Sequence, residues 1–288
     1  HECKDITYKE NIQDCDEQNG TDMNISVYQT PVAEINSSDG MICGETDTLS
    51  AQLPDIYSGF WQSDTSITFI PDSTSDFVIV ETTTFDSHII KWTITNNNIC
   101  FDTDSVDIQF LEPVPNGGNI AGDNQIIYYQ FETEVDGLLP DVSTASGIWN
   151  IVEANIGVEI ANPEDPTTTI SGLEFGISYF SWEITNGVCP PVIDTMFVDV
   201  RPIQQTNGFS PNGDGINDVF KIKGIENTQY NKLVIFDNWG DVVYSSENYQ
   251  NDWDGKNLHG KDLPSDTYYF VLSIPELGEY SGFLILKR

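Results

Sequence analysis

Polar side chains near the C-terminus have the types and spacing that could bind a hard metal ion. Carboxylate and amide oxygens suit Ca²⁺, and Gly215 stands where a calcium loop has its glycine. The pattern is incomplete, because Ser210 and Lys221 occupy the first and last ligand positions. An Asx-rich turn that satisfies its own backbone N–H groups is the alternative. The possible calcium ligands are Asn212, Asp214, Asn217 and Asp218.

The sequence does not contain a recognisable catalytic motif. None of the three histidines, His1, His88 and His259, belongs to an HExxH motif or stands beside a nucleophile motif. The segment around Ser210 lacks the final glycine of a nucleophile elbow. Pairs of carboxylates are expected by chance among 46 Asp and Glu residues. We therefore predict that the protein is not an enzyme.

Short runs rich in β-branched and aromatic residues recur between clusters of Gly, Pro, Asn and Asp. Helical periodicity is almost absent, so the pattern is typical of the strands of β-sandwiches. We therefore expect an all-β chain whose strands position the polar loops. Clear examples of strand-length runs are 77–80, 89–95, 233–236 and 268–272.

The charge of the chain is strongly negative and unevenly distributed. Its 288 residues include 11 Lys and Arg against 46 Asp and Glu, a net charge of −35. Phosphate backbones repel such a polyanion, so we do not expect nucleic acid as a partner. Residues 204–288 hold 7 bases and 12 acids (7 − 12 = −5), which leaves −30 for residues 1–203. We interpret the acidic part as a solvated, self-repelling stalk; calcium shared between modules is the alternative.

An internal repeat divides the acidic part of the chain. The sequence Ser-Gly-Phe-Trp at 58–61 matches Ser-Gly-Ile-Trp at 146–149, and 92–96 matches 182–186. The chain is therefore predicted to be a C-terminal fragment of a larger repeat protein. The predicted domains are the end of a preceding repeat at 1–32, two repeats at 33–115 and 116–203, and a terminal module at 204–288.

Cysteine and tryptophan positions in the repeats resemble those of immunoglobulin-like domains, where an inter-sheet cysteine pair lies beside a core Trp. The resemblance implies tandem immunoglobulin-like β-sandwiches and a disulfide between Cys43 and Cys100. Tyr128 replaces the first cysteine in the second repeat, which leaves Cys189 with no obvious partner. The alternative is that Cys43 and Cys100 are simply buried small hydrophobic residues.

Five short motifs follow one another in the terminal module. Their order and spacing closely resemble the gliding-motility-associated C-terminal domain, the type B sorting domain of the type IX secretion system. The resemblance implies a smaller C-terminal β-sandwich domain, and the upstream repeats are similar to modules of large gliding-motility adhesins. The motifs lie at 209–220, which contains Ser-Pro-Asn-Gly-Asp-Gly, at 233–244, which contains Asp-Asn-Trp-Gly, and at 251–255, 263–270 and 280–288.

This resemblance implies a role in export. A protein with such a domain passes through the periplasm, crosses the outer membrane by the type IX translocon and stays at the cell surface. Attachment there is implied to use a PorP/SprF-like outer-membrane β-barrel protein. The chain would then be part of a large cell-surface adhesin, with surface polysaccharide as a possible ligand. The alternative function is a calcium-dependent carbohydrate-binding or adhesive module, with the repeats as its binding surface.

The end of the chain is the predicted contact for the outer-membrane partner. An apolar strand at a sheet edge offers N–H and C=O groups that a partner can extend, while two terminal cations can pair with carboxylates. The alternative is that the two bases only keep an apolar strand soluble. The predicted partner-binding residues are Phe283, Leu284, Ile285, Leu286, Lys287 and Arg288.

Overall fold

The computed structural model describes residues 30–37, 39–96, 100–115, 117–139 and 142–288. The elements among these residues are β-strands, apart from one 3-10 helix, η1 (Ile225–Asn227). The prediction of an all-β chain is therefore confirmed. No helix in the described part is long and apolar enough to cross a membrane. Cys3, Cys15 and nearly all of the predicted preceding repeat at 1–32 lie outside the described residues.

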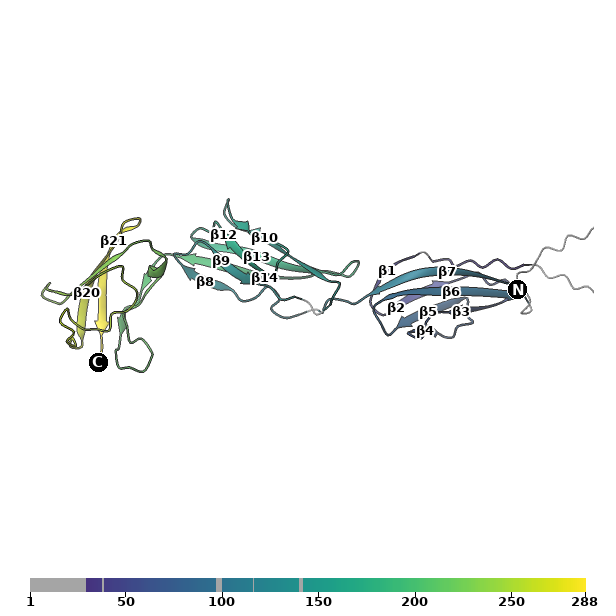
Figure 1. Ribbon diagram of the computed structural model, residues 1–288, viewed down its shortest axis with the longest axis horizontal. Helices are drawn as coiled ribbons and strands as arrows, with labels where there is room; N and C mark the ends of the chain where they lie inside the picture. Colours follow the sequence, from purple (N-terminus) through teal and green to yellow (C-terminus); the bar gives the residue numbers. More distant parts are fainter. Residues whose placement is uncertain (1–29, 38, 97–99, 116, 140–141) are drawn as a thin grey trace, which may run out of the picture. The chain divides into compact units, whose positions relative to one another are not determined.

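In Figure 1 the colours follow the sequence, and the strands come in three successive groups: β1 to β7, β8 to β14 and β15 to β21. The described residues also fall into two compact units. The first unit contains the described residues from 30 to 115 together with 142–146 and 184–192. The second unit contains 117–139, 147–183 and 193–288.

The first repeat folds as a sandwich of two sheets, with strand orders β1-β7-β6-β3 and β2-β5-β4. β1 is parallel to β7, and the other neighbours are antiparallel. Burial alternates along β5, because successive side chains of a strand point to opposite faces. The strands are β1 (Gly40–Cys43), β2 (Thr46–Ser50), β3 (Ser58–Gln62), β4 (Ile67–Ile70), β5 (Phe77–Thr82), β6 (Ser87–Asn96) and β7 (Cys100–Leu111).

Two buried tryptophans lie at the centre of the first sandwich. The rings of Trp61 on β3 and Trp92 on β6 have centroids 4.9 Å apart. Trp61 donates its indole N–H to the carbonyl oxygen of Ser75 at 2.8 Å, and Trp92 donates to that of Gln52 at 3.3 Å. Gly59 makes room for the second ring, because a Cβ there would lie 2.1 Å from Trp92 Cζ2. The sequence Ser-Gly-Phe-Trp therefore builds a specific core contact.

The second repeat has the same topology, with strand orders β10-β13-β14-β8 and β11-β12-β9. β8 is parallel to β14, as β1 is to β7. The rings of Trp149 and Trp182 are 5.1 Å apart, and a Cβ on Gly147 would lie 2.1 Å from Trp182 Cζ2. The strands are β8 (Gln125–Tyr128), β9 (Thr133–Asp136), β10 (Ser146–Glu153), β11 (Glu159–Ile160), β12 (Thr167–Ser171), β13 (Gly176–Thr185) and β14 (Val192–Arg201).

Some of the many carboxylates hold the backbone rather than only face solvent. Asp104 accepts a hydrogen bond from the backbone N–H of Ile35 at 2.9 Å. Asp194, in the second repeat, accepts one from the backbone N–H of Ala121 at 3.0 Å. Both contacts fix the segment that leads into the first strand of a sandwich. Part of the acidic excess is therefore structural.

The C-terminal domain pairs a five-stranded sheet, with order β16-β21-β20-β18-β19, with the short sheet β15-β17. Its core contains Phe220, Tyr249, Trp253 and Phe270. Burial raises the pKa of the Tyr249 hydroxyl, which donates to the carbonyl oxygen of Phe220. The strands are β15 (Gln204–Gln205), β16 (Gly208–Phe209), β17 (Ile222–Lys223), β18 (Lys232–Phe236), β19 (Val242–Glu247), β20 (Asp266–Ile274) and β21 (Gly278–Leu286).

The contact between glycine and tryptophan yields a testable prediction. Gly59→Ala should destabilise the first repeat by about 1–3 kcal/mol, because the added methyl overlaps the Trp92 ring. Ser58→Ala, on the exposed neighbouring position, should change stability by less than about 0.5 kcal/mol. Differential scanning calorimetry would measure both variants. Equal unfolding temperatures for the two would show that the contact is unimportant.

Candidate functional site

In the polar loop at 210–218, which follows β16, side chains accept hydrogen bonds from the loop's own backbone. Both carboxylate oxygens of Asp218 accept backbone hydrogen bonds, one from Gly213 and one from Gly215, each at 2.7 Å. These two bonds lower the pKa of Asp218. Both glycines have positive φ, +81° and +85°, a conformation that glycine adopts most easily. The carboxylate thus fills an anion-binding concavity made by its own loop.

The other predicted calcium ligands are used in the same loop. Asn212 Oδ1 accepts the backbone N–H of Asp214 at 3.0 Å, and Asp214 Oδ1 accepts that of Ile216 at 2.8 Å. The side-chain amide of Asn212 also donates to Asp214 Oδ2 at 2.9 Å. The hydrogen bonds are those of an Asx-rich turn. One loop thus holds Asn212, Asp214, Asn217 and Asp218.

Among the described residues, no group of three or more His, Cys, Asp or Glu side chains could hold a metal ion. Calcium binding by the loop at 210–218 therefore stays a prediction, and no step of the functional argument uses it.

The terminal strand β21 is not at the edge of its sheet, so the predicted edge is wrong. It lies between β16 and β20, and Gly208 and Phe209 pair with Ile285 and Leu286. The backbone N–H of Ile285 donates to Asn207 at 3.0 Å. The physical reason is the two-residue strand β16, which returns beside the end of β21 and is too short to leave a sequence signal. A partner cannot add a strand where β16 already pairs.

The six predicted partner-binding residues do not form one surface. Leu284 and Leu286 are buried in the core, whereas Phe283 and Ile285 are 54% and 49% exposed. Lys287 is exposed beside a groove of about 390 Å³ that residues 207–210 also line. Only Phe283, Ile285 and Lys287 therefore keep side chains available for a partner.

Arg288 is bound to its own domain rather than free. Its guanidinium donates to the carbonyl oxygens of Leu263 at 2.9 Å and Gly255 at 3.1 Å. It also forms an ion pair with Asp262 at 3.0 Å. The prediction that both terminal bases serve a partner is therefore wrong for Arg288, because the end of β21 brings it against the loop at 254–263.

The predicted disulfide between Cys43 and Cys100 is also wrong. Cys43 is bonded to Cys189, in the turn between β13 and β14. Cys43 ends β1 and pairs with Leu111, the last residue of β7, whereas Cys100 is the first residue of that 12-residue strand. A strand rises about 3.3 Å per residue, so the two ends of β7 lie about 35 Å apart. Cys100 takes part in a disulfide of its own.

The Cys43–Cys189 bond belongs to a packed junction inside the first compact unit. The amide of Asn186, which is buried, donates to the carbonyl oxygen of Glu112 at 2.8 Å. Gly187 approaches so closely that a Cβ there would lie 2.5 Å from Leu111 Cδ1. The junction therefore joins the turn at 186–189 to the ends of β1 and β7.

Tyr128 matches Cys43 in the repeat and forms a junction inside the second unit. The ammonium of Lys223 lies 4.7 Å from the centroid of the Tyr128 ring and 3.3 Å from its hydroxyl. The hydrogen bond from Lys223 lowers the pKa of this hydroxyl. Asn227 donates to the carbonyl oxygen of Tyr128 at 2.9 Å. The disulfide that Cys43 forms in the first repeat is thus replaced by polar and cation–π contacts of Tyr128 at the matching position of the second repeat.

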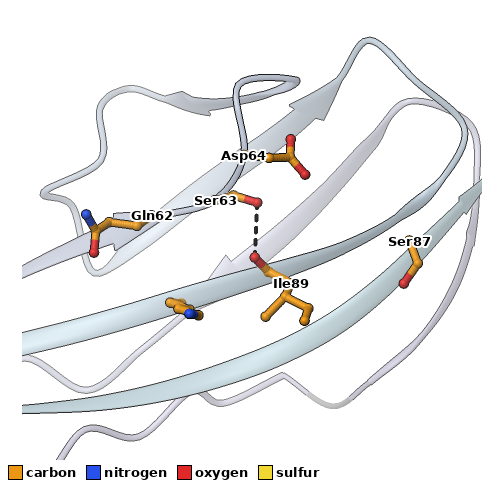
Figure 2. Close-up of a pocket in the computed structure, with 6 residues that line it drawn as sticks. Gln62, Ser63, Asp64, Ser87 and Ile89 are labelled. Atoms are coloured by element: carbon orange, nitrogen blue, oxygen red, sulfur yellow. Dashed lines mark hydrogen bonds between the residues drawn. The ribbon is translucent and has the colours of Figure 1, made fainter.

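A hollow of about 500 Å³ lies on the first repeat, and Figure 2 shows it. At the wall of this hollow, the hydroxyl of Ser63 donates a hydrogen bond to the carbonyl oxygen of Ile89 at 3.1 Å. None of the six lining side chains is aromatic, so they do not form a stacking platform for a sugar ring. The lining residues are Gln62, Ser63, Asp64, Ser87, Ile89 and Lys91.

Sequence reasoning missed a polar chain beside this hollow. His88 Nδ1 lies 2.8 Å from Asp64 Oδ2, and His88 Nε2 lies 3.2 Å from Thr82 Oγ1. Hydrogen bonds from Ser66, and then from His88, lower the pKa of Asp64 to about 2. Acid, imidazole and hydroxyl thus follow in the order of a hydrolase triad, but His88 is only 3% exposed and Thr82 is buried. A substrate could not reach them, so the chain serves to satisfy a buried histidine.

Comparison with known families decides the nature of the C-terminal domain. Residues 203–286 match the family model of the CHU_C type IX secretion signal domain. The C-terminal domain is a type IX secretion signal domain. Such a domain implies interaction with the secretion system and export to the cell surface. The matched residues include the Asx-rich loop and strand β21.

Solved structures resemble the chain in fold alone. The PKD domain from KIAA 1837 protein is 19% identical, covers 31% of this chain and 91% of its own, and has a TM-score of 0.27. Titin domains I67–I69, in an E-to-A variant, are 9% identical over 88% of this chain and 98% of their own, with a TM-score of 0.43. The PKD domain from human KIAA0319 is 25% identical over 28% and 78%, with a TM-score of 0.26. No curated protein matches the chain.

Peptide mapping tests the disulfide. Digestion of the non-reduced protein with a Glu-specific protease should release one peptide pair that links Cys43 to Cys189. Cys189→Ser should speed amide hydrogen exchange in 184–192, because the turn loses its covalent tie. A peptide pair linking Cys43 to Cys100 would contradict the structure.

The two terminal bases should differ in their effect on stability. Arg288→Ala should destabilise the C-terminal domain by about 1–2 kcal/mol, because the carbonyl oxygen of Leu263 loses the donor that Arg288 supplies and that of Gly255 keeps only the backbone N–H of Leu263. Lys287→Ala should change stability by less than about 0.5 kcal/mol, because its side chain is exposed. Urea unfolding of both variants would measure the difference. Similar unfolding curves would mean that the contacts of Arg288 contribute nothing.

Proposed function

We propose that this chain is the C-terminal part of a non-enzymatic cell-surface adhesin. In this proposal the type IX translocon reads the C-terminal domain, and a PorP/SprF-like outer-membrane β-barrel protein then holds the protein at the outer membrane. The repeats act as an acidic stalk that extends from the anchored end. The single observation that carries the proposal is the match of 203–286 to a type IX secretion signal domain.

The chemistry of the repeats supports a stalk. The segment 1–203 has a net charge of −30, which keeps it solvated and opposes collapse. The four repeat tryptophans are buried in the cores, so they are not available to stack on sugars. The disulfide between Cys43 and Cys189 suits a protein that passes an oxidising compartment.

The calcium-dependent carbohydrate-binding function is the weaker proposal. It needs exposed aromatic platforms and a converging set of oxygen ligands. The buried tryptophans and the Asx-rich turn at 210–218 supply neither. Surface polysaccharide as a ligand therefore stays a prediction.

Removal of the C-terminal domain tests the export proposal. A chain that ends at residue 202, expressed in cells with a type IX system, should remain in the periplasm, whereas the full chain should reach the surface. Protease added to intact cells would digest only the exported protein, and immunoblotting would measure the fraction. If the shortened chain reached the surface in the same proportion, the proposal would be wrong.

A further inference from the structure

Two turns of the C-terminal domain share one hydrogen-bond pattern. In the turn 237–241, Asp237 Oδ1 accepts the backbone N–H groups of Trp239 and Asp241, both at 2.9 Å. The backbone N–H of Asp237 donates to the carbonyl oxygen of Asp241 at 3.0 Å, and that of Gly240 donates to Asp237 at 3.1 Å. Gly240 has φ +88°, which completes a closed and rigid turn.

The turn 257–261 repeats these four bonds. Asn257 Oδ1 accepts the N–H groups of His259 at 2.9 Å and Lys261 at 3.0 Å. The N–H of Asn257 donates to Lys261 at 2.8 Å, and that of Gly260 donates to Asn257 at 2.9 Å. Gly260 has φ +75°. Each turn therefore holds its own backbone, from which the outer side chains project, by hydrogen bonds within the turn.

Both turns and the Asx-rich loop lie at the same end of the five-stranded sheet. β18 runs into the turn 237–241, and its last residue, Phe236, pairs with Tyr269 near the start of β20. The start of β20 pairs with the end of β21, whose Arg288 contacts the loop at 254–262. β16 is parallel to β21, so the loop at 210–218 leaves the sheet at this end too. The junction with Tyr128 uses 223–227, before β18 begins, and so lies toward its other end.

Each of these three segments exposes a large apolar side chain. Trp239 is 90% exposed, Ile216 67% and Leu258 60%. The other five tryptophans of the chain are at most 2% exposed. A tryptophan that is held in solvent does not contribute to the core, and the turn fixes the backbone from which it projects before any partner arrives. Tryptophan is enriched among the residues that contribute most to protein–protein binding, and a fixed backbone lowers the cost of ordering the contact.

We propose that Trp239, with Ile216 and Leu258, docks this end of the domain into an apolar pocket on a protein of the export apparatus. The proposal rests on the proposed export function and names the surface that the apparatus would read. A protein pocket is favoured over a lipid surface by the charge of this end. The segments 210–218, 237–241, 254–266 and 287–288 hold 4 bases and 7 acids, a net charge of −3 (4 − 7 = −3).

Charge complementarity describes the rim of the pocket. Lys256 pairs with Asp254, and Arg288 pairs with Asp262, so four charges at this end are matched internally. The remaining two bases and five acids give this end an unmatched negative charge, which positive side chains of the partner would neutralise. The pocket should therefore carry Lys or Arg side chains around an apolar floor, whereas anionic headgroups would be repelled.

The test uses the full chain in cells with a type IX system. Trp239→Ala should lower the protease-accessible surface fraction at least about tenfold, as expected for a central interface tryptophan. Trp239→Tyr should restore most of it. Ile156→Ala is the matched control, because Ile156 is a fully exposed apolar residue on a turn of the second repeat. It should be exported like the parent chain. Phe283→Ala reports on the sheet face of β21.

Purified protein supplies two further readouts. The unfolding temperature of Trp239→Ala should stay within about 1 °C of the parent, since exposed side chains contribute little to stability. Flotation with vesicles of phosphatidylethanolamine and phosphatidylglycerol should not recover the parent chain. Flotation that depends on Trp239 would make the occupant a lipid surface and overturn the proposal, and a large fall in unfolding temperature would make the role structural.

The outcomes separate this inference from the export function. Normal export of the chain that ends at residue 202 would refute the export function itself. Retention of that chain with normal export of Trp239→Ala would overturn the docking surface and leave the export function standing. Loss of export with Phe283→Ala, but not with Trp239→Ala, would move the contact to the sheet face.

Discussion

The close contact between a glycine and a tryptophan ring is the constraint on which both repeats depend. In each sandwich the glycine of the Ser-Gly-x-Trp segment leaves a space that only a residue without Cβ permits, and the Trp of the facing strand fills it. The two indoles of a repeat then pack within about 5 Å of each other, and their N–H groups find backbone acceptors. The two strands that carry these rings, β3 and β6 in the first repeat, are held in one register, because a shift of one residue would turn a ring to the other face of the sheet. A chain with so many carboxylates can therefore keep dense and mainly apolar cores.

The charge of the chain shapes what remains outside these cores. Mutual repulsion among carboxylates favours extended contact with water, but Asp104 and Asp194 show that individual acids also fix backbone N–H groups. Junctions between successive elements then need contacts that do not rely on apolar surface. One uses a covalent bond from Cys43 to Cys189, and the other uses Tyr128 with Lys223 and Asn227. The matching positions Cys43 and Tyr128 thus both form a junction, the first by a covalent bond and the second by polar and cation–π contacts.

The C-terminal domain uses its own end as part of the fold. Strand β21 is enclosed by β16 and β20, and Arg288 binds carbonyl oxygens of a neighbouring loop. Residues 285–288 are therefore part of the fold of this domain. Recognition then falls to side chains that the fold leaves outside, of which Trp239 is the most exposed tryptophan.

The sequence by itself determined the strand class, the repeat and the nature of the terminal domain, because each depends on local patterns. Alternating apolar residues and Gly, Asn and Asp turns mark strands such as 268–272, and the linked motifs from Phe209 onward mark the signal domain.

Only the tertiary structure decided which side chains meet. Cys43 and Cys100 fit a familiar spacing, yet the parallel pairing of β1 with β7 places them at opposite ends of a strand. Likewise β16, with two residues, leaves no periodic signal but pairs with the end of β21 at Ile285 and Leu286. Contacts between residues distant in sequence depend on the order of the strands in a sheet. No single segment of the sequence predicts that order.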